Sequence, residues 1–216
     1  MLDTRFPRLR GDIGCAETFD FPVRYVVVKG ALPRRVVVGR DRSLLQPFIA
    51  AAQALEADGC SAIATSCGFL ALFQHEMQRV VGVPVWTSSL LLVAELEATL
   101  PAEQRVGIVT ADAASLTEDH LAAVGARADA PIEGLAPDSA FHRTLLDNRI
   151  ALDAAEAQAA TVAAAKRLVA KHPNLGAIVL ECTNMPPYAD AVRAASRLPV
   201  HDITTLIAAR LAALHP

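Results

Sequence analysis

Short runs of apolar, often β-branched residues alternate along the chain with longer stretches rich in alanine and leucine. The runs lack the polar alternation of a half-exposed strand, so they predict strands that are buried on both faces. We expect strands at 25–28, 36–38, 62–65, 83–86, 106–110, 177–180 and 200–203. We expect helices at 44–58, 69–80, 90–99, 114–124, 151–171, 188–196 and 205–214. This alternation is typical of βαβ units and predicts an α/β fold with parallel sheets flanked by helices.

The two halves of the chain follow the same order of elements. Residues 61–67 read Ser-Ala-Ile-Ala-Thr-Ser-Cys, and residues 176–182 read Gly-Ala-Ile-Val-Leu-Glu-Cys. A helix and a proline-containing strand follow each cysteine, and Pro84 and Pro199 lie equally far from their cysteines. The match indicates duplication. We therefore expect two pseudo-symmetric flavodoxin-like lobes, 1–100 and 101–216, with an active-site cleft between them and the last helix packing on the first lobe.

Composition limits the classes of function. The chain has 216 residues, of which 53% are hydrophobic and 20% charged, with a formal net charge of −3. Its basic residues form no stripe, so we expect no nucleic-acid partner. Its apolar runs are short and the first residues are polar, so we expect neither a membrane span nor a secretory signal. Four cysteines without a CxxC pair favour free thiols and a cytoplasmic protein.

Two of these cysteines stand where chemistry is expected. Cys67 and Cys182 each follow a predicted strand and precede a helix, and parallel sheets bind ligands at that end of the strands. We expect the helix N-terminus to lower each thiol pKa from about 8.5 toward neutrality. Two thiols on opposite walls of a cleft could remove a proton from a carbon and return one from the other side. Backbone N–H groups could hold a carboxylate, so the scheme needs no metal or cofactor.

Other residues have a structural interpretation beside the functional one. A lone cysteine is most often a small buried hydrophobe, and this interpretation suits Cys60 and Cys15. Thr183 and Asn184 follow the second cysteine and could cap a helix, bind substrate, or do both. Thr110 ends a strand and could equally be a cap or a site residue. Asp3 could be a surface carboxylate.

The sequence around both cysteines resembles a known family. Residues 181–186, Glu-Cys-Thr-Asn-Met-Pro, resemble the second-cysteine motif of the aspartate/glutamate racemase superfamily. Residues 64–68, Ala-Thr-Ser-Cys-Gly, lie where that family has its first cysteine, and Asp3-Thr4 is similar to its opening strand end. The resemblance implies a cofactor-independent isomerase of amino-acid metabolism, an aspartate/glutamate-type racemase that is a homodimer. It implies Cys67 and Cys182 as the catalytic bases. The substrate contacts expected are Asp3, Thr4, Ser66, Gly68, Phe69, Thr110, Thr183 and Asn184.

Three residues depart from the family pattern. Gly68-Phe69 replace the Asn-Thr that follows the first cysteine in the family, and Glu181 replaces a common glycine. Other reactions of the superfamily are therefore alternatives: hydantoin racemase, arylmalonate decarboxylase or maleate isomerase. A further alternative is a binding protein for a small carboxylate that does not turn it over. The racemase hypothesis predicts that loss of either thiol abolishes activity.

Overall fold

Two parallel sheets lie at the centre of the computed structural model, which describes residues 1–214. In the first half of the chain, β1 pairs with β2, and Ile63 lies beside Val85. In the second half, the strand order is β4-β3-β5-β6, and every pair is parallel. The strands are β1 (Ile63–Ala64), β2 (Val85–Trp86), β3 (Arg105–Thr110), β4 (Ile132–Gly134), β5 (Leu175–Leu180) and β6 (Val200–His201). The α/β class predicted from the sequence is confirmed.

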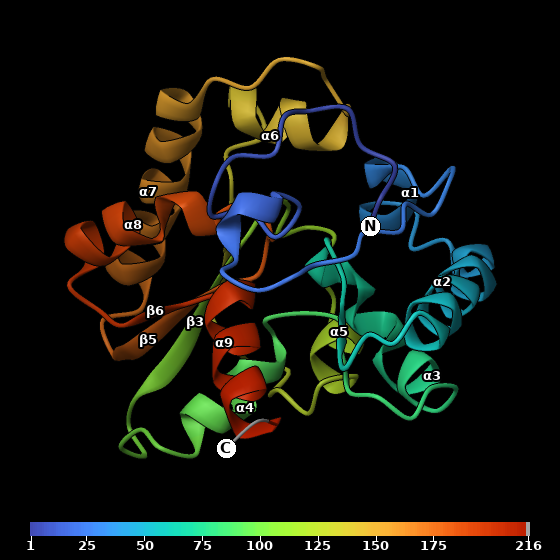
Figure 1. The fold of residues 1–216 in the computed structure, drawn as a ribbon. Coiled ribbons are helices and arrows are strands. Elements are labelled where there is room, and N and C mark those ends of the chain that lie inside the picture. Colours follow the sequence, from blue (N-terminus) through green and yellow to red (C-terminus); the bar gives the residue numbers. More distant parts are fainter. Residues whose placement is uncertain (215–216) are drawn as a thin grey trace.

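Helices cover the sheets, as Figure 1 shows. Helix α7 packs on β3, β4 and α8, while α4 packs on β3 and β5. The α-helices are α1 (Pro33–Val37), α2 (Leu45–Ala57), α3 (Gln74–Gln78), α4 (Leu91–Glu97), α5 (Glu118–Ala122), α6 (Ala140–Leu146), α7 (Ala154–Lys171), α8 (Ala189–Ser196) and α9 (Ile203–Leu214). The 3-10 helices are η1 (Ala16–Thr18), η2 (Arg42–Leu44), η3 (Gly68–Phe73) and η4 (Pro186–Tyr188).

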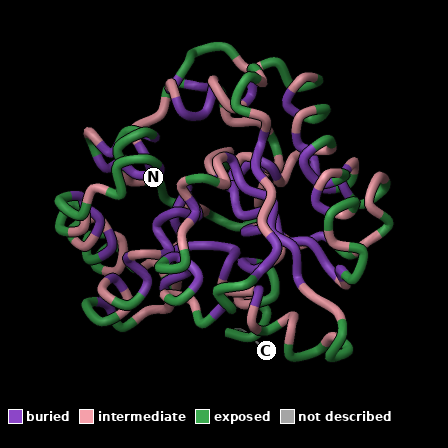
Figure 2. The backbone as a smooth tube through the Cα atoms, turned by 180° about the vertical axis from the view of Figure 1, so that it is seen from behind, coloured by how far each residue is buried: buried purple, intermediate pink, exposed green. Residues whose placement is uncertain are grey.

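Strand β3 is buried on both faces, as its continuous apolar sequence predicts. Val106 and Ile108 join a hydrophobic cluster with residues of the first half, such as Phe48 and Leu90. Val109 points the other way and joins the cluster that includes α7. In Figure 2 the buried chain lies at the centre and the exposed chain at the rim. One of these hydrophobic clusters therefore extends across both halves of the chain, and β3 joins it to the other.

Helix α9 returns to the first half of the chain. Ile203, Leu206 and Ile207 form a cluster with Trp86 at the end of β2 and with Ile13. The lobe boundaries 1–100 and 101–216 stay a prediction, and residues 215–216 of the second lobe lie outside the described residues.

The sequence prediction was wrong near the N-terminus. Residues 25–28 form no strand, and residues 36–38 lie in and after helix α1, where Pro33 occupies the first turn. Proline is favoured there because its missing N–H needs no partner in the first turn. Strand β4 and helix α6 were also not predicted. The remaining predicted strands coincide with β1, β2, β3, β5 and β6 within a few residues.

Candidate active site

An N-terminal segment crosses the carboxyl ends of the strands. We call residues 1–31 the strap; its regular structure within the described chain is limited to η1. The Leu2 amide donates to Ser66 Oγ at 3.0 Å, beside Cys67. At its other side, the Arg5 amide donates to Asn148 Oδ1 at 2.7 Å, and Asn148 Nδ2 donates to the Asp3 carbonyl at 3.1 Å. The strap is thereby hydrogen-bonded to both halves of the chain. In Figure 1 its blue trace extends from the side of α1 to the side of α8.

The two cysteines line one small cavity beneath the strap. Cys67 follows β1 and precedes η3, whereas Cys182 follows β5. Thr183 Oγ1 donates to the Ser66 carbonyl at 2.8 Å, so the two cysteine loops are hydrogen-bonded to each other. Cys67 is 9% exposed and Cys182 is 8% exposed, and the cavity volume is about 30 Å³. The structure thus brings together the thiols that the sequence repeat singled out.

Most of the predicted substrate-contacting residues line this cavity. These are Thr4, Ser66, Gly68, Phe69, Thr183 and Asn184. Thr110 does not line it, but its hydroxyl donates to Glu181 Oε2 at 2.7 Å. Asp3 lies outside the lining, because its carboxylate accepts from the Gly30 amide at 3.1 Å and pairs with Lys29 at 3.8 Å. A direct contact of Asp3 with a ligand in this cavity is therefore not supported.

The expected lowering of the thiol pKa values is wrong. Burial and the neighbouring Glu181 raise the pKa of Cys67 to about 12. The same two causes raise the pKa of Cys182 well above its usual value. Backbone N–H groups of Phe69 and Leu70 favour the Cys67 thiolate, but their effect is smaller than the desolvation of the charge. Both groups are therefore neutral thiols in the unliganded cavity.

Arg8 on the strap is a functional candidate that the sequence did not reveal. It lines the cavity, and its side chain is 12% exposed. The guanidinium pairs with Asp12 at 3.1 Å, donates to Thr4 Oγ1 at 2.8 Å, and lies 4.8 Å from the Phe6 ring centroid. Arg8 Nε is buried and has no hydrogen-bond partner within residues 1–214. A guanidinium with a free donor at a small cavity is suited to a carboxylate.

Asp12 connects the strap to the second cysteine loop. Its carboxylate accepts from Asn184 Nδ2 and from the Gly14 amide, in addition to Arg8. The Cys182 thiol in turn lies 3.8 Å from Asn184 Oδ1. No periodic pattern marks the strap, and its four arginines look alike in sequence, so only the fold identifies Arg8.

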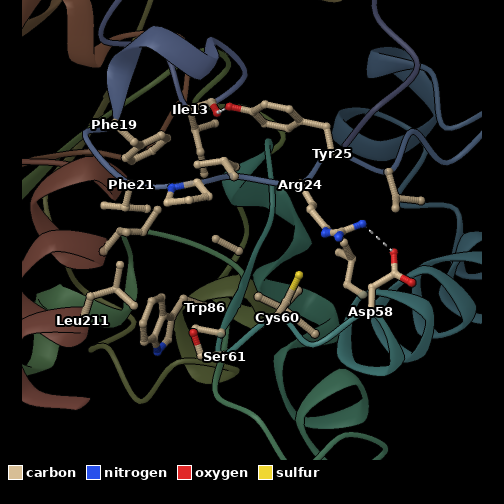
Figure 3. Close-up of a pocket in the computed structure, with 18 of the residues that line it drawn as sticks. Ile13, Phe19, Phe21, Arg24, Tyr25, Asp58, Cys60, Ser61, Trp86 and Leu211 are labelled. Carbon is tan, nitrogen blue, oxygen red and sulfur yellow. Dashed lines mark hydrogen bonds and ion pairs between the residues drawn. The ribbon is translucent and has the colours of Figure 1, made fainter. Parts of the chain in front are cut away.

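A second, larger cavity lies beside the first and is shown in Figure 3. Its volume is about 540 Å³, and aromatic side chains of Phe19, Phe21, Tyr25 and Trp86 line it. Tyr25 Oη donates to the Ile13 carbonyl at 2.9 Å. Neither catalytic candidate thiol lines this cavity, although Ser66 lines both. Cys60, interpreted from sequence as structural, lies in its wall.

Among residues 1–214, no group of three or more His, Cys, Asp or Glu side chains has the arrangement of a metal site. Within the same residues, no helix has the length and apolar character that crossing a bilayer requires.

The sequence model of the Asp/Glu/Hydantoin racemase family matches residues 39–211. The chain belongs to this family. The fold agrees: a mutant arylmalonate decarboxylase in a sulfate-associated form superposes with a TM-score of 0.57 at 19% identity, over 84% of this chain and 77% of that one. Glutamate racemase RacE1 from Bacillus anthracis superposes with a TM-score of 0.54 at 14% identity, over 81% of this chain and 65% of that one. At these identities the likeness concerns the fold.

Curated relatives correct the functional prediction. A dimethylsulfoniopropionate lyase from Durusdinium sp. clade D is 32% identical over 93% of this chain and 69% of its own length. Dimethylsulfoniopropionate lyase 7 from Emiliania huxleyi is 32% identical over 99% of this chain and 65% of its own length. The chain thus spans about two thirds of these relatives. The prediction of an amino-acid racemase, an isomerase of amino-acid metabolism, is wrong, because the relatives of this family member are named as lyases.

Proposed function

We propose that the protein is a lyase that cleaves dimethylsulfoniopropionate into dimethyl sulfide and acrylate. The observation that carries the proposal is a cavity that holds two thiols and a guanidinium with a free donor, in a chain whose relatives are named for this substrate. The substrate carries a carboxylate at one end and a sulfonium cation at the other. Elimination from it requires a base at the carbon next to the carboxylate and donors for the carboxylate oxygens.

Arg8 is the proposed carboxylate ligand. Its unpartnered Nε can donate one charge-assisted hydrogen bond, while its pairing with Asp12 keeps the guanidinium in place. The thiolate of Cys67 or Cys182 takes the proton from the carbon next to the carboxylate. The electrons of that C–H bond form the double bond of acrylate as the C–S bond breaks. The sulfonium sulfur keeps the electron pair of the C–S bond and leaves as neutral dimethyl sulfide, and the thiol releases its proton to solvent.

The substrate itself would help to form the base. Both thiols are neutral in the unliganded cavity because their charged forms are desolvated. A sulfonium cation brought into the same low-dielectric cavity favours the nearby thiolate, since opposite charges attract more strongly there than in water. The base would therefore form only in the presence of its substrate.

Substrate entry requires the strap to move. The cavity volume of about 30 Å³ is close to the share of one water molecule in the liquid. Within the strap, Gly11 and Gly30 are the residues with positive φ values, 101° and 75°, in the left-handed region that glycine adopts without steric cost. Displacement of the strap would open the cavity and would carry Arg8 with it.

An elimination needs one base, and this separates it from a racemisation, which needs two. The test is release of dimethyl sulfide from purified wild-type protein, measured by gas chromatography, with acrylate followed by proton NMR. We expect Cys67→Ser and Cys182→Ser to differ: the variant that lacks the base loses about 10³-fold or more of the rate, and the other keeps a measurable rate. Cys60→Ser is the matched control and keeps full activity. Wild-type protein that releases no dimethyl sulfide, or full activity in both variants, would refute the proposal.

A homodimer in the cytoplasm, expected from the sequence, remains part of the proposal. All four cysteines are free in the structure, which supports a reducing compartment.

A further inference from the structure

Glu181 is a buried carboxyl group. The mechanism proposed above uses the two thiols and the Arg8 guanidinium and gives Glu181 no role. Its side chain is fully buried and lines the catalytic cavity. Thr110 Oγ1 donates to Oε2 at 2.7 Å, whereas Oε1 is buried and has no hydrogen-bond partner within residues 1–214. An unpaired oxygen in such a place costs free energy, so it calls for an explanation.

The neighbouring loop is shaped to admit this carboxyl group. A Cβ atom added at Gly68 would lie 2.5 Å from the Glu181 carbonyl oxygen and 2.8 Å from Glu181 Cδ, and closer still to Oε1. Gly68 immediately follows Cys67, so the carboxyl group lies between the two cysteine loops. When Glu181 is ionised, its negative charge raises the pKa of both thiols, and it does so more than any other charged group.

Among residues 1–214, no lysine, arginine or histidine forms an ion pair with Glu181. The groups that face it are the two thiols of Cys67 and Cys182 and, from the strap, Arg8, whose guanidinium is paired with Asp12. The Asp12 carboxylate on the strap also opposes a negative charge at Cys182, and it contributes to the raised pKa of that thiol. Burial raises the pKa of Glu181 to about 7, and the Thr110 hydrogen bond only partly opposes this. Below that pH the neutral carboxyl has a proton to donate.

We propose that protonated Glu181 is a second hydrogen-bond donor to the substrate carboxylate, which it contacts through Oε1 while Oε2 accepts from Thr110. The proposal rests on the proposed lyase function. Proton removal moves negative charge from the thiolate onto the carboxylate oxygens, so the substrate passes through an enediolate-like state. Arg8 from the strap and Glu181 from the end of β5 would each donate to one of the two oxygens.

The neutral form suits the reaction better than the charged form. A Glu181 carboxylate could pair with the sulfonium, but this attraction disappears as dimethyl sulfide leaves, so it would favour bound substrate over the transition state. It would also oppose formation of a thiolate in the same cavity. A neutral donor instead becomes more strongly bound as charge develops on the oxygens.

Three variants distinguish these roles. Glu181→Gln keeps a donor of the same shape without a titrating group, and we expect its rate of dimethyl sulfide release to lie within about tenfold of wild type. Glu181→Ala removes the donor, and we expect a loss of about 10² to 10³-fold in kcat. Because the pKa of Glu181 is raised to about 7, we expect kcat of wild-type protein to fall as the pH rises through that value, and we expect no such fall in Glu181→Gln. A Glu181→Gln variant as inactive as Glu181→Ala would overturn the proposal in favour of a base or a counter-ion.

Infrared difference spectra test the donor without any lyase activity. Wild type minus Glu181→Gln should show the band of a protonated carboxyl group that disappears as the pH rises through about 7. Propionate, used as a carboxylate probe in calorimetry, should bind more weakly to wild type above that pH and with unchanged affinity to Glu181→Gln. If wild-type protein releases no dimethyl sulfide, the lyase function fails while these two measurements still decide the role of Glu181. An ionised carboxyl across the whole range would overturn the donor.

Discussion

Removal of the Arg8 charge should lower the free energy of unfolding and weaken substrate binding, and the two effects can be measured separately. The Arg8–Asp12 pair is largely buried, with side chains 12% and 4% exposed. In Arg8→Met, the Asp12 carboxylate loses two hydrogen bonds of 3.1 and 3.2 Å but keeps those from the Gly14 amide and Asn184. Loss of one partner of a buried pair costs about 3 to 5 kcal/mol. We expect about 3 kcal/mol, at the lower end, because Asp12 retains two donors.

A second substitution separates charge burial from catalysis. Asp12→Asn in the Arg8→Met background removes the unpaired charge and should restore about 2 kcal/mol of the free energy of unfolding. It should not restore KM, which we expect to rise by about ten- to a hundredfold because a hydrogen bond to a charged group is lost. Urea unfolding followed by circular dichroism measures the first quantity, and dimethyl sulfide release measures the second.

The control is the exposed pair of Arg127 and Asp129, with side chains 57% and 58% exposed. Arg127→Met should have little effect on the free energy of unfolding and leave KM unchanged, since exposed ion pairs contribute little. The assignment of Arg8 fails if Arg8→Met matches this control in both stability and KM. Recovery of KM in the double variant would show that Arg8 acts through the fold and not on the substrate.

Two further predictions follow from the packing around the cavity. Gly68→Ala places a methyl group against the Glu181 backbone. It should lower the free energy of unfolding in urea by about 1 to 3 kcal/mol and should lower the rate of dimethyl sulfide release. In the control Gly82→Ala, the new Cβ meets the flexible end of Glu56 at 3.4 Å, and the loss should be less than about 0.5 kcal/mol. His120 is fully buried, and burial lowers its pKa from 6.5 to about 4. Folding favours the neutral ring, so the contribution of His120 to the free energy of unfolding is complete above pH 6.5 and is lost as the pH falls toward about 4. His120→Gln should flatten this decline, and an unchanged slope would contradict the assignment.

The position of the two thiols at one cavity could be predicted from the sequence because its signal is local and repeated. A strand that ends at a cysteine and leads into a helix occurs twice, and parallel strands bring such ends to one edge of their sheet. The thiols of Cys67 and Cys182 do line one cavity. The pKa values of these thiols could not be predicted in this way. The sequence shows that a helix begins near each cysteine, but it does not show the burial whose effect on the pKa is larger.

Arg8 and the role of Glu181 depend on contacts between distant segments. Arg8 enters the cavity only because the strap, which has no hydrophobic periodicity, is held by Ser66 and Asn148. Glu181 was noted as a departure from the family pattern, but its unpartnered oxygen and its fit against Gly68 require coordinates. The family matches residues 39–211, so the strap with Arg8 lies outside the matched region.

The error in the predicted reaction has a chemical cause. Racemisation and elimination share their first step, removal of a proton next to a carboxylate by a positioned base. A thiol pair at two strand ends predicts this proton removal. It does not predict whether a proton is returned or a leaving group is lost, because the substrate determines that step. When the adjacent carbon carries a good leaving group such as a sulfonium, the new electron pair expels it before a second acid can return a proton. The second thiol is then dispensable for turnover, and for this reason the two single-cysteine variants are expected to differ in a lyase although they would be equally inactive in a racemase.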